Sequence, residues 1–72
     1  MITKDQAVAL TLGAVLHHTS RKDHQGKPTK CRVNGKCKTW ARKPERFELP
    51  VKFGMYECFR VTERNAADWE VA

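Results

Sequence analysis

The sequence predicts one small α+β domain over residues 1–72, with an antiparallel sheet or partly closed barrel and a short helix near each end. Three observations carry this prediction. Several short segments are rich in β-branched and aromatic residues, an Asn-Gly pair suits a tight turn between two of them, and helix-capping residues occur near both ends. A chain of 72 residues buries only about 60% of its unfolded surface, so a deep catalytic cleft is not expected.

The first helix is predicted to begin at Thr3. The segment TKDQ at 3–6 is a capping-box pattern, in which the Thr3 hydroxyl accepts from the Gln6 amide and the Gln6 side chain reaches back. An apolar stripe follows, formed by Ala7, Val8, Leu10 and Leu12. Gly13 is expected to end this helix after about two turns. A helix this short must pack on another element to be stable.

Three strands are expected in the next part of the chain. Residues 15–19 are short and partly β-branched, and the polar segment 20–28 with its Gly and Pro reads as a loop. Residues 29–33 and 36–41 are expected to form a hairpin around Asn34-Gly35. A type I′ turn needs positive φ at both central residues, which Asn and Gly tolerate best.

The C-terminal third is expected to contain two more strands and a helix. Residues 47–53 alternate apolar with polar, which predicts a half-buried strand; Pro50 lacks an amide donor and therefore favours an edge strand or an extended loop. After a turn at Gly54, residues 55–61 are apolar on both faces and read as the central strand. Thr62 or Asn65 could cap a helix over roughly 63–70, whose apolar residues Ala66, Ala67 and Trp69 would cover the sheet.

Charge is concentrated in one segment. Residues 20–46 hold ten Lys or Arg against two acidic residues, a net charge of +8, whereas the rest of the chain carries −2, for a total of +6. A polarised domain attracts an anionic partner over about 8 Å at physiological salt. The partner could be a phosphate backbone or an acidic protein surface, and a solvated face that only maintains solubility is the plainer alternative.

The candidate binding residues come from this basic segment, which includes Trp40, and from Phe47 directly after it. They are Arg21, Lys22, Lys30, Arg32, Lys36, Lys38, Trp40, Arg42, Lys43 and Phe47. Trp40, Arg42 and Phe47 are the candidate anchors, because buried aromatic and Arg side chains dominate interface energies. Trp40 has a second interpretation, as a core residue beneath a curved sheet with lysines extending past it.

Metal binding and catalysis are weakly indicated. Six residues could bind zinc: His17, His18, His24, Cys31, Cys37 and Cys58. No Cys-x2-Cys or His-x3-His spacing occurs, and in the expected hairpin Cys31 and Cys37 would point to opposite sides of the sheet. A three-residue loop would put these two on one side. Cys58 with a histidine is the only conceivable nucleophilic pair, and its apolar strand would raise the thiol pKa. We therefore expect no metal, no cofactor and no enzymatic activity.

Three segments carry a resemblance to a known family. The order NGKCKTW, RKPERFELPVKFG and YECFRVTERNAADWEV, from Asn34 onward, resembles a family of small proteins encoded by tailed bacteriophages. The resemblance covers about half of the chain, and His17-His18 extends it loosely. It implies a small regulator that binds core subunits of the host bacterial RNA polymerase, inhibits initiation and promotes terminator read-through, in the manner of a siphophage transcription regulator.

Two other functions stay open at this point. The basic segment could bind DNA or RNA directly, although no RNP-type motif, Gly-x-x-Gly loop or Arg-rich helix is present. The chain could also inhibit another host protein, such as a defence nuclease. The apolar run AVALTLGAVL has neither a basic n-region nor the length to cross a bilayer. We therefore expect a monomer in the host cytoplasm, with no membrane contact.

Overall fold

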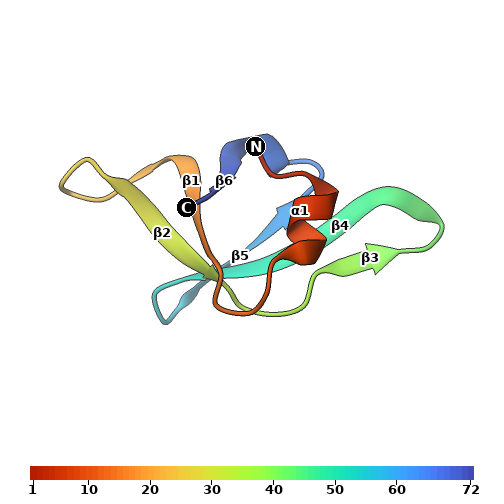
Figure 1. Ribbon diagram of the computed structural model, residues 1–72. Coiled ribbons are helices and arrows are strands. Elements are labelled where there is room, and N and C mark those ends of the chain that lie inside the picture. Colours follow the sequence, from red (N-terminus) through yellow and green to blue (C-terminus); the bar gives the residue numbers. More distant parts are fainter.

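The computed structural model describes residues 1–72 and shows an antiparallel six-stranded sheet that does not close into a barrel. The predicted α+β class is confirmed. The elements are α1 (Lys4–Ala9), β1 (Val15–Lys22), β2 (Pro28–Val33), β3 (Lys38–Trp40), β4 (Lys43–Phe53), β5 (Glu57–Thr62), the 3-10 turn η1 (Ala66–Asp68) and β6 (Trp69–Val71). The strand order is β3-β4-β2-β1-β6, and β5 pairs with β4 (Figure 1).

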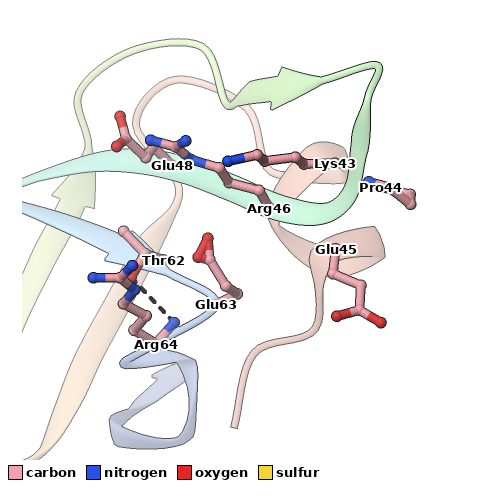
Figure 2. A pocket seen from close by; sticks show the side chains of 8 residues that line it. All are labelled: Lys43, Pro44, Glu45, Arg46, Glu48, Thr62, Glu63 and Arg64. Carbon is pink, nitrogen blue, oxygen red and sulfur yellow. Dashed lines mark hydrogen bonds between the residues drawn. The ribbon is translucent and has the colours of Figure 1, made fainter.

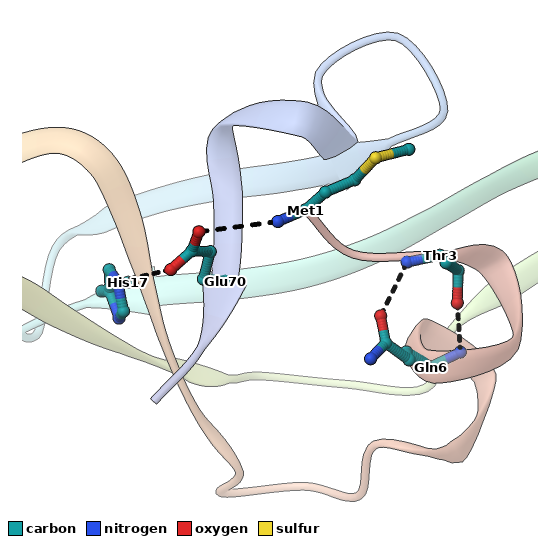
Figure 3. Close-up of polar contacts among 5 residues, drawn as sticks. All are labelled: Met1, Thr3, Gln6, His17 and Glu70. Atoms are coloured by element: carbon teal, nitrogen blue, oxygen red, sulfur yellow. Dashed lines mark hydrogen bonds and ion pairs between the residues drawn. The ribbon is translucent and has the colours of Figure 1, made fainter.

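The capping box of α1 forms as predicted. The Gln6 amide donates to the Thr3 hydroxyl at 3.2 Å, and the Thr3 amide donates to the Gln6 side chain at 3.0 Å (Figure 3). The helix is shorter than expected, since it ends at Ala9 and Leu10 is already extended. The prediction that Gly13 ends the helix is wrong: Gly13, with φ +88°, lies in the turn that leads into β1.

The predicted loop at 20–28 is shorter than expected: residues 23–27 form the turn, and both ends of the segment belong to strands. β1 continues to Lys22, and β2 begins at Pro28. The turn between them is held by the Asp23 carboxylate, which accepts from the amides of Gln25 and Lys27 at 2.9 and 3.0 Å. The polar composition of this segment therefore reflects an exposed hairpin, because polar side chains suit a strand that extends into solvent.

The predicted hairpin around Asn34-Gly35 does not form. β2 already has β1 on one edge and β4 on the other, so no edge is left for residues 36–41. Neither Asn34 nor Gly35 has a positive φ, and the Asn34 amide donates to the Pro50 carbonyl at 2.9 Å. A Cβ on Gly35 would lie 3.0 Å from Pro50 Cγ, so this glycine permits a close crossing over β4. β3 is only three residues long and pairs with β4.

β4 is the centre of the sheet, whereas Pro50 predicted an edge strand. β5 pairs with residues 48–53 of β4 on one edge, while β2 and β3 share the other edge at 51–52 and 43–48. Pro50 falls between those two partners. The N and O atoms of a strand residue point to the same edge, so the absent amide of Pro50 faces the crossing at 34–37, where no ladder needs it.

β5 is an edge strand, and the prediction of a central strand over 55–61 is wrong. It pairs with β4 alone, and residues 57–60 are exposed. Part of its outer edge is covered by the Asn65 side chain, which accepts from the Thr62 amide at 2.8 Å and donates to the Arg60 carbonyl at 3.0 Å. This side chain replaces a strand partner and shortens the unpaired edge, which limits edge-to-edge association.

The predicted helix over 63–70 is a single 3-10 turn followed by β6. The Asn65 side chain is hydrogen-bonded to β5 and makes no capping hydrogen bond to η1. Ala66 and Trp69 are buried, as expected, but Ala67 is exposed. Trp69 begins β6, which pairs with β1 through the register His18 opposite Trp69. The end of the predicted helix therefore forms a strand, β6, that extends the sheet.

One cluster of twelve buried residues forms the core on one side of the sheet. Its members are Ile2, Ala7, Leu16, Cys31, Val33, Phe47, Leu49, Val51, Phe53, Val61, Ala66 and Trp69. The N-terminal segment covers this side, because Ile2 and Ala7 are part of the core and the Ile2 amide donates to the Ala66 carbonyl at 3.0 Å. We call this side the covered face. Glu70 follows the buried Trp69 and lies on the other side of the sheet, 3.8 Å from the Met1 amino group and 3.4 Å from His17 (Figure 3).

Candidate binding surface

The opposite side of the sheet, which we call the open face, carries the side chains that alternate with the core. On β4, Phe47, Leu49, Val51 and Phe53 are buried, and the residues between them point the other way. Residues directly opposite in an antiparallel pair share a face. The register therefore places Arg32 beside Lys52, and Arg60 beside Pro50, on the open face.

The open face is strongly basic. Six basic residues lie on its strands, and Lys36 joins them from the segment between β2 and β3; the strand residues are Lys30, Arg32, Lys38, Arg46, Lys52 and Arg60. Among the strand residues of this face, the acidic ones are Glu48 and Glu70. The formal net charge of the face is thus +5, seven minus two, which is most of the +6 of the whole chain.

Two of these residues form a like-charge pair across strands. Arg32 and Lys52 lie directly opposite each other, an arrangement that destabilises a sheet by roughly 0.2–1 kcal/mol relative to neutral pairs. Glu48 offsets the positive charge of two other residues, because it lies opposite Lys38 and 3.9 Å from Arg60 Nη1. Folding alone does not require this concentration of positive charge.

The structure brings only part of the predicted site together. Lys30, Arg32, Lys36 and Lys38 all belong to the open face. Trp40 lies near them at the end of β3, half-buried, with the Arg46 guanidinium 4.0 Å from its ring centroid. One face of the indole is therefore occupied by a cation–π contact.

Five predicted residues lie elsewhere: Phe47, Arg21, Lys22, Arg42 and Lys43. Phe47 is 2% exposed in the core, so the prediction that it is a surface anchor is wrong. Arg21 is held on the covered side, where it binds both Glu57 carboxylate oxygens at 2.8 Å and stacks 4.3 Å from the Phe53 ring. Two pairs of basic residues are at hairpin ends, away from the open face: Lys22 with Lys27, and Arg42 with Lys43.

Sequence reasoning missed Arg46, Lys52 and Arg60. A signal for Lys52 was present, because the alternation in 47–53 places it on the solvent side of a half-buried strand. Arg60 had no such signal, since residues 55–61 read as apolar on both faces. Its position follows only from the register of β5 on β4, where it lies opposite Pro50.

A hollow between the start of β4 and the end of β5 is poorly suited to a small molecule. It measures about 670 Å³, and no hydrophobic residue lines it (Figure 2). Its charges are balanced, with Lys43, Arg46 and Arg64 against Glu45, Glu48 and Glu63. Small-molecule sites are mainly apolar with a few polar groups, so this hollow is better described as a hydrated groove.

The cysteines and histidines do not form a common site. No three His, Cys, Asp or Glu side chains gather where they could hold a metal ion, and all three cysteines are unpaired. Burial raises the pKa of the Cys31 thiol, and it also raises the pKa of Cys37. Both thiols are therefore kept in the protonated, less nucleophilic form.

No helix of this protein has the length and apolar character needed to cross a membrane. Comparison of the chain with known family models, with curated proteins and with solved structures finds no match. The resemblance to the phage family therefore stays a prediction, and the open face is the feature from which a function must be argued.

Proposed function

We propose that this protein is a phage-encoded transcription regulator that docks its open face on an acidic surface of the host RNA polymerase. The observation that carries the proposal is the charge of that face, on which seven basic side chains lie with two acidic ones. The polymerase as partner, with inhibited initiation and terminator read-through as outcomes, rests on the sequence resemblance.

The aromatic residues favour a protein surface over single-stranded nucleic acid. Proteins that hold single strands stack successive bases on exposed aromatic rings beside a basic groove. On the open face the nearest ring is Trp40, and Arg46 covers one side of it. Tyr56 is exposed but lies in the turn after Gly54, and Phe59 belongs to the other side of the sheet, opposite Val51. The open face thus provides charge without a stacking platform.

Direct binding to a nucleic-acid backbone is the second candidate. The Arg32–Lys52 pair favours it, because closely spaced cations on neighbouring strands suit regularly spaced phosphates. Phosphate binding loses affinity steeply with salt, with a slope close to the number of phosphates neutralised. A protein interface with an apolar centre depends on salt less steeply and mainly through its association rate.

The test is capture of polymerase from nuclease-treated bacterial lysate, followed by binding to the purified core enzyme. The informative variant is Arg32→Glu with Lys52→Glu, and the matched control is Lys22→Glu with Lys27→Glu, which changes the net charge equally at a hairpin end. We expect the native protein and the control to bind core polymerase and the open-face variant to lose at least tenfold in affinity, which is about 1.4 kcal/mol.

Two results would contradict the proposal. Failure of the native protein to bind purified core polymerase would remove the partner. Equal weakening by both double variants would show that only overall charge matters. Steep salt-dependent binding to a DNA duplex, lost in the open-face variant, would support the second candidate instead.

A further inference from the structure

A second hollow beside β5 has no part in the proposed function so far. It measures about 290 Å³ and is lined by His18, Ser20, Arg21, Phe53, Phe59, Arg60, Asn65 and Trp69. Three of these are large aromatic side chains, with Phe53 between the other two: its ring lies 5.5 Å from Phe59 and 5.9 Å from Trp69. The hollow is therefore an aromatic recess at the end of the covered face.

Phe59, at the edge of the recess, is partly exposed although its position in the sheet faces the core. Phe59 lies opposite Val51, whose side chain is fully buried, yet Phe59 is 42% exposed. Its neighbour in register, Val61 opposite Leu49, is fully buried. The cover over the core therefore stops between these two positions of β5, and it leaves an aromatic ring accessible beside a recess large enough for one side chain.

The polar groups around the recess are already paired. Ser20 Oγ and His18 Nδ1 lie 2.9 Å apart, the Asn65 amide is used at both ends by β5, and Arg21 binds Glu57. The indole N–H of Trp69 has no partner but is sealed from solvent. A nucleobase would bury polar edges here without partners, which is costly, whereas an apolar side chain has no such groups.

The rim of the recess is continuous with the open face. Arg21 and Arg60 line it; the Glu57 carboxylate, 2.8 Å from Arg21, neutralises that residue, so Arg60 supplies the positive charge of the rim. Arg60 also lines a smaller hollow of the open face, together with Lys36, Lys38, Glu48 and Pro50. Arg60 therefore stands between the two sites, and a chain lying on the open face could turn over the β5 edge into the recess.

From this geometry we propose that the recess holds one large apolar side chain, aromatic or leucine, of an acidic segment of the partner protein. This inference rests on the proposed function, because the flanking acidic residues are those that the open face binds. The recess also provides an apolar anchor site, which the open face lacks. Interface energy is concentrated in a few apolar or Arg anchors near charged rims, and neither Phe47 nor the stacked Trp40 is available as such an anchor.

The direct test uses two synthetic peptides, Asp-Asp-Phe-Asp-Asp and Asp-Asp-Ala-Asp-Asp, titrated into the native protein while the Trp69 indole signal is followed by NMR. We expect the Phe peptide to bind on the order of tenfold more tightly and to shift the indole signal, since it fills the recess. Phe59→Ala should remove this advantage and retain the weak binding of the Ala peptide. Tyr56→Ala is the matched control, because Tyr56 is 90% exposed and does not line the recess.

A second variant keeps the test valid if Phe59→Ala disturbs folding. Ser20→Trp would place an indole in the recess from β1 without removing a core side chain, and it should also abolish the Phe advantage. Equal affinity of the two peptides for the native protein would overturn the inference, as would displacement of the Phe peptide by thymidine monophosphate.

The polymerase assay separates the two proposals. If core polymerase binds the native protein and Phe59→Ala equally, the recess has no role as an anchor site and the proposed function stands. If polymerase binds neither protein, while the Phe peptide still binds through Phe59, the recess stands and the polymerase is not the partner.

Discussion

The two faces of β4 are built from alternating residues of one strand, yet they differ in almost every property. Leu49 and Val51 are fully buried in the core, while Pro50 and Lys52 between them lie on the open face. The covered face contains no buried charged residue, whereas the open face concentrates seven basic side chains. The core side of β4 thus stabilises the fold, while the open side is proposed to bind the partner. Mutations on the two sides should therefore change stability and binding separately.

The largest expected effect comes from the covered face. Leu49→Ala should lower the free energy of unfolding by about 2–5 kcal/mol, because it deletes a fully buried side chain and leaves a cavity in a small core. Lys52→Ala, three positions along the same strand, should change it by less than about 0.5 kcal/mol. Urea unfolding measures both, and similar values for the two variants would break the distinction between the faces.

Two arginines provide the second comparison. Arg21→Ala should destabilise the fold by about 1 kcal/mol, because it removes a two-oxygen contact with Glu57 and a stack on Phe53 at a partly exposed site. Arg60→Ala should be nearly neutral, since its contact with Glu48 is 3.9 Å long and its side chain is 71% exposed. Thermal unfolding tests this, and a larger loss for Arg60→Ala would contradict it.

A single charge reversal should raise stability and weaken binding together. Lys52→Glu converts the Arg32–Lys52 pair into an opposite-charge pair, which should stabilise the sheet by roughly 0.2–1 kcal/mol. The same change removes a cation from the proposed docking surface, so affinity for core polymerase should fall. Lys27→Glu at the β1–β2 turn is the control for net charge. Loss of both stability and binding in Lys52→Glu would show that the pair serves the fold.

The smallest expected effect is the pH dependence from the two sheltered thiols. Burial raises the pKa of Cys31 and of Cys37 above the ordinary value of 9.0, so the unfolded chain loses these protons at lower pH than the folded protein does. Their contribution to stability is therefore complete below pH 9 and is lost as pH rises toward the folded-state pKa.

Replacement of both sheltered thiols tests this contribution. Cys31→Ala with Cys37→Ala should flatten the fall in stability above pH 9, measured as the urea midpoint against pH, relative to the native protein. Cys58→Ala is the matched control at the exposed cysteine. An equal slope in all three proteins would assign the pH dependence to other groups.

Local patterns in the sequence predicted local structure well. The capping box at Thr3 and Gln6 requires only residues within one turn, and it forms as expected. The alternation in 47–53 also holds, because the pleat places successive side chains on opposite faces whichever strands lie alongside. Buried and exposed positions of β4 could therefore be assigned before any strand pairing was known.

Strand partners could not be read in this way. Asn34-Gly35 suited a hairpin, and Pro50 suited an edge, but both expectations treated each segment in isolation. In the folded chain β4 is long enough for β2 and β3 to share one of its edges, and Pro50 falls in the gap between them. Which strand pairs with which edge depends on all the strands of the sheet, so a local sequence pattern cannot predict the pairing.

The sequence by itself determined the small α+β class, the first helix, the alternation along β4 and the excess of positive charge. Only the tertiary structure decided that Arg60, distant in sequence, joins Arg32 and Lys52 on one face. The physical reason is that hydrophobic alternation and capping act between neighbours in the chain. The grouping of charges into a surface instead depends on register between strands far apart in sequence.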